Sequence, residues 1–373
     1  MTYGQRIFSI VPDSAATPEL KAAKVEHLGP LPGPGLKDQH NRVLRDLRLS
    51  VIDQCNFRCT YCMPKEVFGR DYPFLPKASL LTFSEINTLA RVFVSLGVEK
   101  LRITGGEPLL RKSLEDLIAT LSVLKTPSGN PVEIAMTTNG VLLKEKAGLL
   151  KEAGLHRVTV SLDALGDDVF RRMNDMDYPV SDVLAGIDAA IEAGLSVKIN
   201  MVVQRGVNDL EILPMAEAFR DRGLTLRFIE YMDVGSSNAW QLDQVVSAQE
   251  IVNTISTRHP LTPIGRDIPS EVSEQWEYVD GKGKIGMISS VTKPFCGNCS
   301  RARISAEGVL YTCLFAESGT DLRSLLRQSD APSDTDLAHA IANVWTQRTD
   351  RYSELRHMLP RDSKKVEMSY IGG

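Results

Sequence analysis

The chain lacks any run of apolar residues close to the ~20 that a membrane-spanning helix requires, and it lacks the apolar segment of a secretory signal. It also has no large excess of charge, because 43 Lys and Arg face 47 Asp and Glu, for a formal net charge of -4. Neither a membrane nor nucleic acid is therefore an expected partner. The length of 373 residues and the ordinary composition predict a soluble globular protein.

Histidine and cysteine are both scarce, with six residues of each. No histidine lies close enough in sequence to complete a local zinc site with three cysteines, and a long chain of this composition does not need disulfides to fold. The cysteines instead fall into two groups of three, and none is left over for packing. The first triad is Cys55, Cys59 and Cys62, and the second triad is Cys296, Cys299 and Cys313.

Each triad has the thiolate number of a [4Fe–4S] cluster with one exposed iron. A cluster held only by protein normally takes four thiolates. Three thiolates leave one iron free to bind another molecule, which suits chemistry rather than a purely structural role. The sequence therefore predicts two [4Fe–4S] clusters, and reduced thiols of this kind indicate a cytoplasmic protein.

Short β-rich segments alternate with amphipathic helical segments after residue 44. Thr82 and Glu85 form a capping box before the first helix, and Gly97 ends that helix. Six strand–helix units predict an α/β fold, an incomplete parallel (βα)6 TIM-like barrel followed by a C-terminal second-cluster domain. Strands are predicted at 47–53, 100–104, 132–137, 157–162, 197–203 and 225–231, and helices at 84–96, 113–124, 144–152, 182–193, 209–221 and 247–256.

Polar and glycine-rich motifs follow the ends of these predicted strands. In parallel barrels, binding and catalytic groups lie on the loops at the carboxyl ends of the strands. We therefore expect these motifs to meet on one face of the barrel. In chain order they are the first triad, Gly105-Gly106-Glu107-Pro108, Thr138-Asn139-Gly140, Asp163 and Met232.

The chain divides into three predicted parts. Residues 1–41 are an N-terminal extension, because the segment 29–35, Gly-Pro-Leu-Pro-Gly-Pro-Gly, can form neither a helix nor a central strand. Residues 42–256 form the barrel. The βα pattern then stops, and residues 257–373 form a predicted C-terminal iron–sulfur domain around the second triad, with a strand at 284–288 and helical stretches around 320–328 and 335–357.

Several longer motifs resemble those of one enzyme family. They are Leu-Arg-Leu-Ser-Val, Leu-Arg-Ile-Thr-Gly-Gly-Glu-Pro-Leu-Leu-Arg, Thr-Thr-Asn-Gly, Val-Ser-Leu-Asp, Arg-Phe-Ile-Glu-Tyr-Met, Phe-Cys-Gly-Asn-Cys-Ser-Arg-Ala-Arg and Ser-Tyr-Ile-Gly-Gly. With the Cys-x3-Cys-x2-Cys spacing, they make the chain resemble the MoaA family of GTP 3′,8-cyclases, which are radical S-adenosylmethionine (SAM) enzymes. The resemblance runs from about residue 44 to the C-terminus, and nothing transfers to the N-terminal extension.

By this resemblance, SAM binds the free iron of the cluster on the first triad, in contact with Tyr61, Gly106, Ser161 and Met232. Glycine allows a close approach of backbone groups, and a hydroxyl at a strand end can bind a ribose or a carboxylate. Taken singly, these residues are explained equally well as a turn, a strand end or core filler. Their common position at strand ends favours the binding role.

The resemblance also implies that the free iron of the second cluster binds the guanine of GTP. GTP carries about four negative charges, so a dry pocket must supply fixed cations. The basic residues alternate with apolar neighbours in predicted strands whose two faces are normally covered, so a polar cavity is favoured over a surface position. The implied GTP contacts are Arg48, Arg102, Thr137, Lys198, Arg301, Ala302 and Arg303.

The implied activity is conversion of GTP to 3′,8-cyclo-7,8-dihydro-GTP, the first step of molybdenum cofactor biosynthesis. A 5′-deoxyadenosyl radical takes the hydrogen from ribose C3′, and the C3′ radical attacks guanine C8. No side chain is assigned as a catalytic residue, because the radical comes from SAM. The implied partners are an electron donor, the cyclic pyranopterin monophosphate synthase that receives the product, and a second copy in a homodimer. Gly372 and Gly373 are expected to reach into the active site.

Two other functions explain part of the sequence. A peptide or sulfatase maturase also carries more than one cluster, but its C-terminal cysteine set is larger. A non-catalytic iron–sulfur electron carrier would explain the cysteines but neither Gly-Gly-Glu-Pro nor the cations in the strands. Formation of 5′-deoxyadenosine under reducing, anaerobic conditions separates an enzyme from a carrier.

Overall fold

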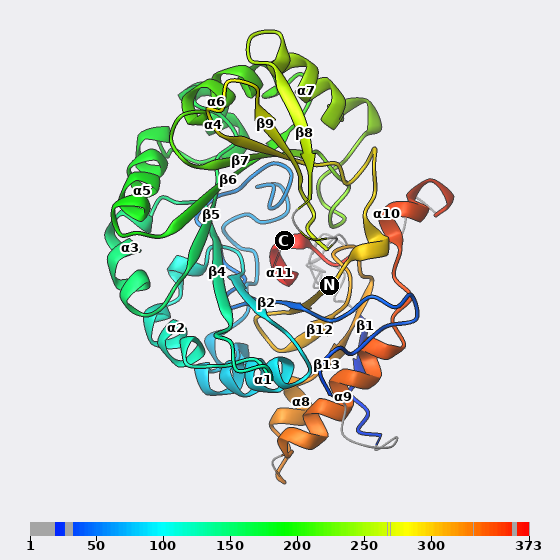
Figure 1. The fold of residues 1–373 in the computed structure, drawn as a ribbon. Helices are drawn as coiled ribbons and strands as arrows, with labels where there is room; N and C mark the ends of the chain where they lie inside the picture. The colour runs from blue at the N-terminus through cyan, green and yellow to red at the C-terminus, as the bar shows by residue number, and fades with distance from the viewer. Residues whose placement is uncertain are drawn as a thin grey trace, which may run out of the picture.

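The computed structural model describes residues 19–26, 33–266, 268, 270–330, 332–359 and 364–372. Across these residues thirteen strands join in one sheet, which curls into an incomplete ring with helices on its outside (Figure 1). The strands are β1 (Glu19–Ala22), β2 (Asp46–Ser50), β3 (Lys100–Thr104), β4 (Glu133–Thr138), β5 (Arg157–Ser161), β6 (Ser196–Val203), β7 (Thr225–Glu230), β8 (Leu261–Gly265), β9 (Glu274–Tyr278), β10 (Lys284–Ile288), β11 (Arg301–Ile304), β12 (Val309–Tyr311) and β13 (Ser318–Asp321).

The centre of the sheet is the parallel series β2 to β7, in chain order. Its strands turn apolar side chains outward against the helices, as Leu101 and Ile103 of β3 do, and both are fully buried. Arg102 lies between them on the inner face. The predicted incomplete (βα)6 barrel is therefore confirmed. Alternation of side chains along each strand separates an apolar outer core from a polar interior.

The helices α1 to α7 follow the strands of the barrel, and α8 to α11 belong to the last part of the chain (Figure 1). The predicted capping box is present, with Thr82 N donating to Glu85 Oε2 at 2.7 Å and Glu85 N donating to Thr82 Oγ1 at 3.2 Å. The bounds of the helices are α1 (Phe83–Ser95), α2 (Leu114–Ser122), α3 (Leu143–Glu152), α4 (Asp167–Asn174), α5 (Val180–Glu192), α6 (Ile212–Phe219), α7 (Ala248–Ser256), α8 (Arg323–Leu326), α9 (Asp334–Thr346), α10 (Tyr352–Leu355) and α11 (Met368–Ile371).

The strands after residue 257 extend the same sheet on both sides. β10 pairs in parallel with β7, and β11 pairs in parallel with β2. The predicted N-terminal extension also takes part, because β1 pairs in parallel with β13. Residues 1–18 and 27–32 of that extension lie outside the described residues. In the part of the chain that the structure describes, no helix is long and apolar enough to cross a membrane.

Two sequence predictions in the last part of the chain are wrong. The helical stretch predicted at 335–357 is interrupted, because α9 ends at Thr346 and α10 begins only at Tyr352, and between them Arg348 turns inward to a buried polar network. The predicted helix 320–328 is shorter, because its first residues complete β13 and only Arg323–Leu326 forms α8. The helix α4 was not predicted at all.

Candidate active site

The first triad lies on the loop that follows β2. Cys62 N donates to the carbonyl oxygen of Cys59 at 2.9 Å, which closes the loop into a turn. Arg58 fastens it further, since its Nη1 donates to the carbonyl oxygen of Cys55 and its Nε donates to that of Phe68, both at 2.7 Å. Burial raises the pKa of Cys55 to about 12. The three thiols are unpaired, as cluster ligation requires.

The motif after β3 packs directly against this loop. Gly106 N donates to the carbonyl oxygen of Ile52 at 2.8 Å. A Cβ on Gly106 would lie 2.2 Å from the carbonyl oxygen of Gln54, so the close approach permits only glycine here. The sequence predicts that Gly106 allows a close approach of SAM to the backbone. The structure gives a second reason for glycine at this position, because the backbone of the cysteine loop packs against it.

Glu107 links the ends of β3 and β4. Its buried carboxylate accepts hydrogen bonds from Asn139 N at 2.7 Å, Thr138 Oγ1 at 2.8 Å and Leu109 N at 3.0 Å. Burial raises its pKa to about 7. The side chain of Asn139 in turn reaches the first triad, 3.9 Å from Cys55 Sγ. The motifs predicted to meet at the carboxyl ends of the strands therefore do meet.

Tyr61 connects the first triad to the end of β5. Its hydroxyl donates a hydrogen bond of 2.8 Å to Asp163 Oδ2, and Val202 N donates to the other oxygen of Asp163. Burial raises the pKa of Asp163 to about 6. This contact holds the aromatic ring next to the cysteines in one orientation, with the phenol fixed by a carboxylate.

The second triad lies at the opposite end of the neighbouring strand. Cys296 and Cys299 precede β11, and β11 runs parallel to β2, whose far end leads into the first triad. A strand of five residues spans about 16 Å, so the two triads lie at opposite ends of the interior, separated by roughly that length. Burial opposes ionisation of Cys299, but Arg301 and Arg348 together lower its pKa to about 6.

Neither triad is arranged as a mononuclear metal site. Among the described residues, no group of three or more His, Cys, Asp or Glu side chains is placed to hold a single metal ion. In a [4Fe–4S] cube each thiolate bonds its own iron, so the sulfurs need not converge on one point. Three free thiols on a short loop, or beside paired arginines, fit such a cube.

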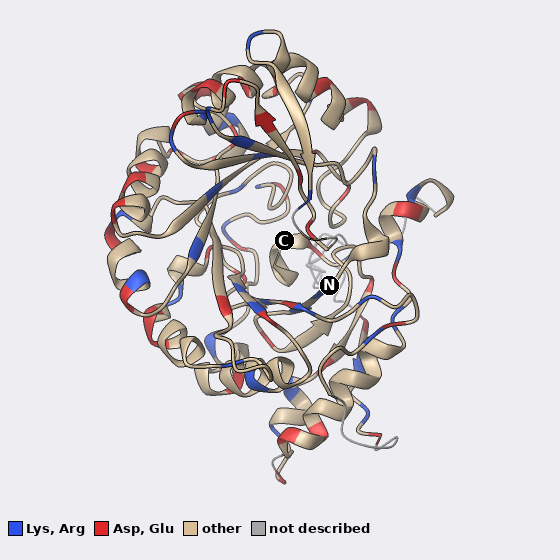
Figure 2. Ribbon diagram, in the orientation of Figure 1, with Lys and Arg blue, Asp and Glu red and all other residues tan. Residues whose placement is uncertain are grey.

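A cavity of about 440 Å³ occupies the interior of the ring and is large enough for a nucleotide. Figure 2 shows Lys and Arg on the strands that surround this interior. The cavity brings together most of the predicted GTP contacts, the whole second triad and two predicted SAM contacts. Those lining residues are Arg48, Arg102, Thr137, Lys198, Arg301, Arg303, Cys296, Cys299, Cys313, Tyr61 and Met232.

Three arginines occupy one level of the sheet. Arg303 of β11 is paired with Arg48 of β2, and Arg48 is paired with Arg102 of β3. Burial and the neighbouring arginines lower the pKa of Arg48, and burial lowers that of Arg102 to about 10. Within the described residues no salt bridge neutralises these three side chains, so the row is a strong site for an anion.

The opposite side of the cavity supplies further cations. Arg227 of β7 and Arg102 both donate hydrogen bonds to Thr159 Oγ1, at 3.2 and 3.3 Å. Burial lowers the pKa of Arg227 to about 9. Lys198 lies 3.9 Å from Glu271 Oε1, and burial lowers its pKa to about 8. Arg227 was missed by sequence reasoning, although it stands between apolar neighbours in its strand just as Arg48 and Arg102 do.

Seven other predicted site residues within the described part of the chain do not line the cavity, and three of them are the cysteines of the first triad, Cys55, Cys59 and Cys62. Gly106 lies against the cysteine loop, and Ser161 is half-buried at the end of β5. Ala302 is fully buried in the apolar core on the other face of β11. Gly372 directly follows α11, and α11 lies inside the ring (Figure 1). Gly373 lies outside the described residues.

The comparisons with known proteins agree with this geometry. Residues 49–219 match the model of the radical SAM superfamily, and residues 224–354 match the model described as Molybdenum Cofactor Synthesis C. The solved structure of Streptococcus suis SuiB bound to precursor peptide SuiA has a TM-score of 0.57 and 14% identity, over 90% of this chain and 73% of that chain, which shows a shared fold.

Curated relatives are much more similar in sequence. The GTP 3′,8-cyclase of Acidothermus cellulolyticus is 48% identical over 362 residues, covering 91% of this chain and 99% of the relative. That of Xanthomonas axonopodis pv. citri is 49% identical over 339 residues, with the same coverage. That of Staphylococcus epidermidis is 44% identical over 342 residues. The chain therefore belongs to the GTP 3′,8-cyclase family of radical SAM enzymes.

Proposed function

We propose that this protein converts GTP to 3′,8-cyclo-7,8-dihydro-GTP, with the SAM-binding cluster on the first triad and the guanine-binding cluster on the second. The observation that carries the proposal is the shared cavity, which joins the thiols of the second triad to the row formed by Arg303, Arg48 and Arg102. The relatives named above as GTP 3′,8-cyclases support the same substrate.

The cofactors of this family are SAM and two [4Fe–4S] clusters. When bound, SAM and the reduced first cluster would supply a 5′-deoxyadenosyl radical to take the hydrogen from ribose C3′. Bonding of C3′ to guanine C8 would then need one further electron, from the electron donor, and a proton to give the dihydro product. The protein's own task is placement, because a small displacement of the reacting atoms costs much of the rate.

The cavity has the charge distribution that such placement requires. Arg48, Arg102 and Arg227 can bind the triphosphate, while the second triad lies beside Arg301 and Arg303 for the guanine end. A nucleotide held at both of these places would have its ribose fixed between them. Burial of the arginines in a confined interior strengthens each contact with phosphate.

The decisive experiment replaces one triad at a time by serine and follows iron, SAM cleavage and cyclised product under anaerobic conditions. We expect about eight irons per chain in the parent and about four in each variant. The first-triad variant should cleave no SAM. The second-triad variant should still form 5′-deoxyadenosine but make no cyclised nucleotide. GTP-dependent cyclisation by the second-triad variant would overturn the proposal.

We also propose partners and a cellular location for the protein. They are an electron donor for the first cluster, transfer of the product to cyclic pyranopterin monophosphate synthase, a homodimer and a cytoplasmic setting. An electron carrier is the competing function, and it predicts no 5′-deoxyadenosine from either variant.

A further inference from the structure

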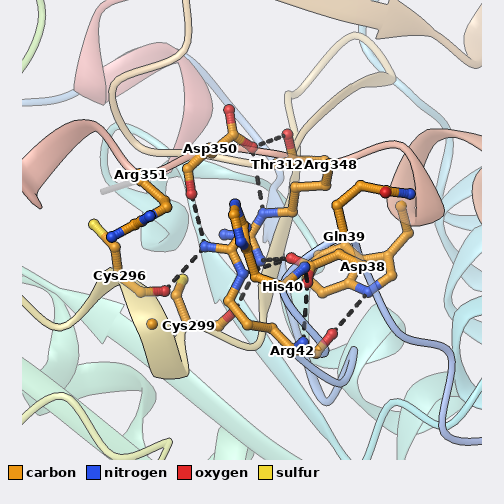
Figure 3. Close-up of polar contacts among 12 residues, drawn as sticks. Asp38, Gln39, His40, Arg42, Cys296, Cys299, Thr312, Arg348, Asp350 and Arg351 are labelled. Carbon is orange, nitrogen blue, oxygen red and sulfur yellow. Dashed lines mark hydrogen bonds and ion pairs between the residues drawn. The ribbon is translucent and has the colours of Figure 1, made fainter. Parts of the chain in front are cut away.

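A buried ionic network lies beside the second triad (Figure 3). Asp38 Oδ2 is 2.5 Å from Arg42 Nε and 3.4 Å from Arg348 Nη1. The side chains of Asp38, Arg42 and Arg348 are 0%, 1% and 1% exposed. Two guanidinium groups from segments about 300 residues apart in sequence therefore share one carboxylate oxygen in a site closed to solvent.

Both guanidinium groups reach the cysteine turn. Arg42 Nη1 donates to the carbonyl oxygen of Cys296 at 2.9 Å and to that of Asp350 at 2.7 Å. Arg348 Nη1 donates to the carbonyl oxygen of Cys299 at 2.7 Å. The two carbonyl groups mark the ends of the Cys-x2-Cys turn, so the pair of arginines fixes the backbone from which both thiols project.

The network extends to the third cysteine. Asp350 Oδ2 accepts hydrogen bonds from Thr312 Oγ1 at 2.6 Å and from Arg348 Nε at 3.3 Å. Thr312 is the residue immediately before Cys313. The two separate stretches that carry the second triad are thus held to one another through Arg348 and its two carboxylate partners (Figure 3).

A simpler explanation is that the network only anchors the segment 36–44 to the end of α9. Other bonds already do this, because Gln39 N donates to the carbonyl oxygen of Arg348 at 3.3 Å and Trp345 Nε1 donates to that of Arg42 at 3.3 Å. Burying several charges is costly, and an apolar cluster would stabilise the same junction at least as well. The donors aimed at the cysteine carbonyls are what an apolar cluster could not provide.

We propose that Asp38 is a positioning residue for the cluster on the second triad, acting through Arg42 and Arg348 to hold the backbone of Cys296 and Cys299. The inference rests on the proposed assignment of a cluster to this triad. Residues that orient metal ligands without touching the metal commonly change metal affinity by about tenfold to a hundredfold when replaced. We expect an effect of that size on retention of the second cluster.

The test uses the full-length chain with the first triad replaced by serine, so that all bound iron reports on the second triad. Asp38→Asn in this background should release iron to a chelator about tenfold to a hundredfold faster than its parent. Because it removes a negative charge near the cluster, it should also shift the midpoint potential, followed by electron paramagnetic resonance, to a more positive value.

Two controls make the result specific. The same substitution in the chain that keeps only the first triad should leave iron release unchanged. Asp334 of α9 forms an exposed ion pair with Arg91 of α1, with 2.8 Å between Oδ1 and Nη2. Asp334→Asn breaks this pair and should change iron release in neither background. Thr312→Val removes only the hydroxyl bound to Asp350 and should speed release about threefold to tenfold. It tests the arm of the network through Arg348 and Asp350 if Asp38→Asn does not fold.

The outcomes separate the two proposals. If the parent with the first triad replaced holds no iron, the assignment of the second cluster fails, and this inference fails with it. If the parent holds about four irons, and Asp38→Asn and Thr312→Val release them at the parental rate, only the positioning role is overturned. If Asp38→Asn lowers the melting temperature but leaves iron release and midpoint potential unchanged, the network is only a structural anchor and the positioning role is likewise overturned.

Discussion

Arg48 and Gly372 are 324 residues apart in sequence, yet Arg48 Nη1 lies 3.4 Å from the carbonyl oxygen of Gly372. Ser50, two residues further along β2, donates to the carbonyl oxygen of Tyr370 at the same distance. Both contacts lie on the inner face of the strand that leads into the first triad. The end of the chain therefore packs against a cavity arginine and the approach to the cysteine loop.

This contact leads to a prediction for Gly372→Ala. Gly372 has a φ of +69°, and a Cβ there would lie 2.4 Å from Thr104 Cγ2. The substitution should displace the tail from Arg48 and lower formation of the cyclised product by about tenfold to a hundredfold, because the reacting atoms are misplaced. Cleavage of SAM should continue, since the cysteine loop is untouched. Product analysis by chromatography measures both.

Two further variants isolate the cause. Gly223→Ala has the same kind of backbone conformation, with a φ of +67°, but open space around the new Cβ, and should keep full activity. Thr104→Ser removes the methyl group that obstructs the Cβ and should restore part of the activity of Gly372→Ala. Full cyclase activity in Gly372→Ala alone would show that the position of the tail does not matter.

Glu107 is predicted to contribute to stability rather than to bind SAM directly. Its carboxylate accepts from two backbone N–H groups and one hydroxyl, and Glu107→Gln turns an amide N–H₂ toward one of these donors. The loss should be about 1–3 kcal/mol in the free energy of unfolding. Denaturant unfolding of the variant measures it, with the exposed Glu145→Gln on α3 as the control. Equal stability of the two variants would contradict this role.

The barrel and both triads could be predicted because they depend on local patterns. Alternating apolar residues and strand-end motifs identify β2 to β7 within a few residues of their observed bounds. The role of Asp38 could not be predicted, because nothing in its segment indicates that Arg348 lies beside it. The helix predicted through Arg348 fails for the same reason, since a buried ionic contact outweighed local helical periodicity.

Arg227 is a different case, because its signal was present in the sequence. It alternates with Leu226 and Phe228 in β7 as Arg102 alternates with Leu101 and Ile103. We predict that Arg227→Ala weakens GTP binding by about tenfold to a hundredfold, the usual cost of one hydrogen bond to a charged group. Guanosine, which has no phosphate, should lose much less affinity.

Equilibrium dialysis with both ligands measures the effect of Arg227→Ala. The exposed Arg258→Ala, whose partner is Glu217 on the surface, should change neither affinity. An equal loss for GTP and guanosine would show that Arg227 does not recognise the phosphates.

Lys198 leads to a prediction about pH. Burial, followed by the nearby Arg227 and Arg157, lowers its pKa to about 8, and only its protonated form attracts phosphate. In the free protein the charged fraction therefore falls between pH 7.5 and 9, and the dissociation constant for GTP should rise about eightfold over that interval. Lys198→Arg carries the more basic guanidinium and should reduce this rise, while titration of Arg227, whose pKa burial lowers to about 9, affects both proteins alike. Ionisation of guanine itself affects both proteins alike, so parallel pH profiles would show that the ammonium group of Lys198 does not bind the triphosphate.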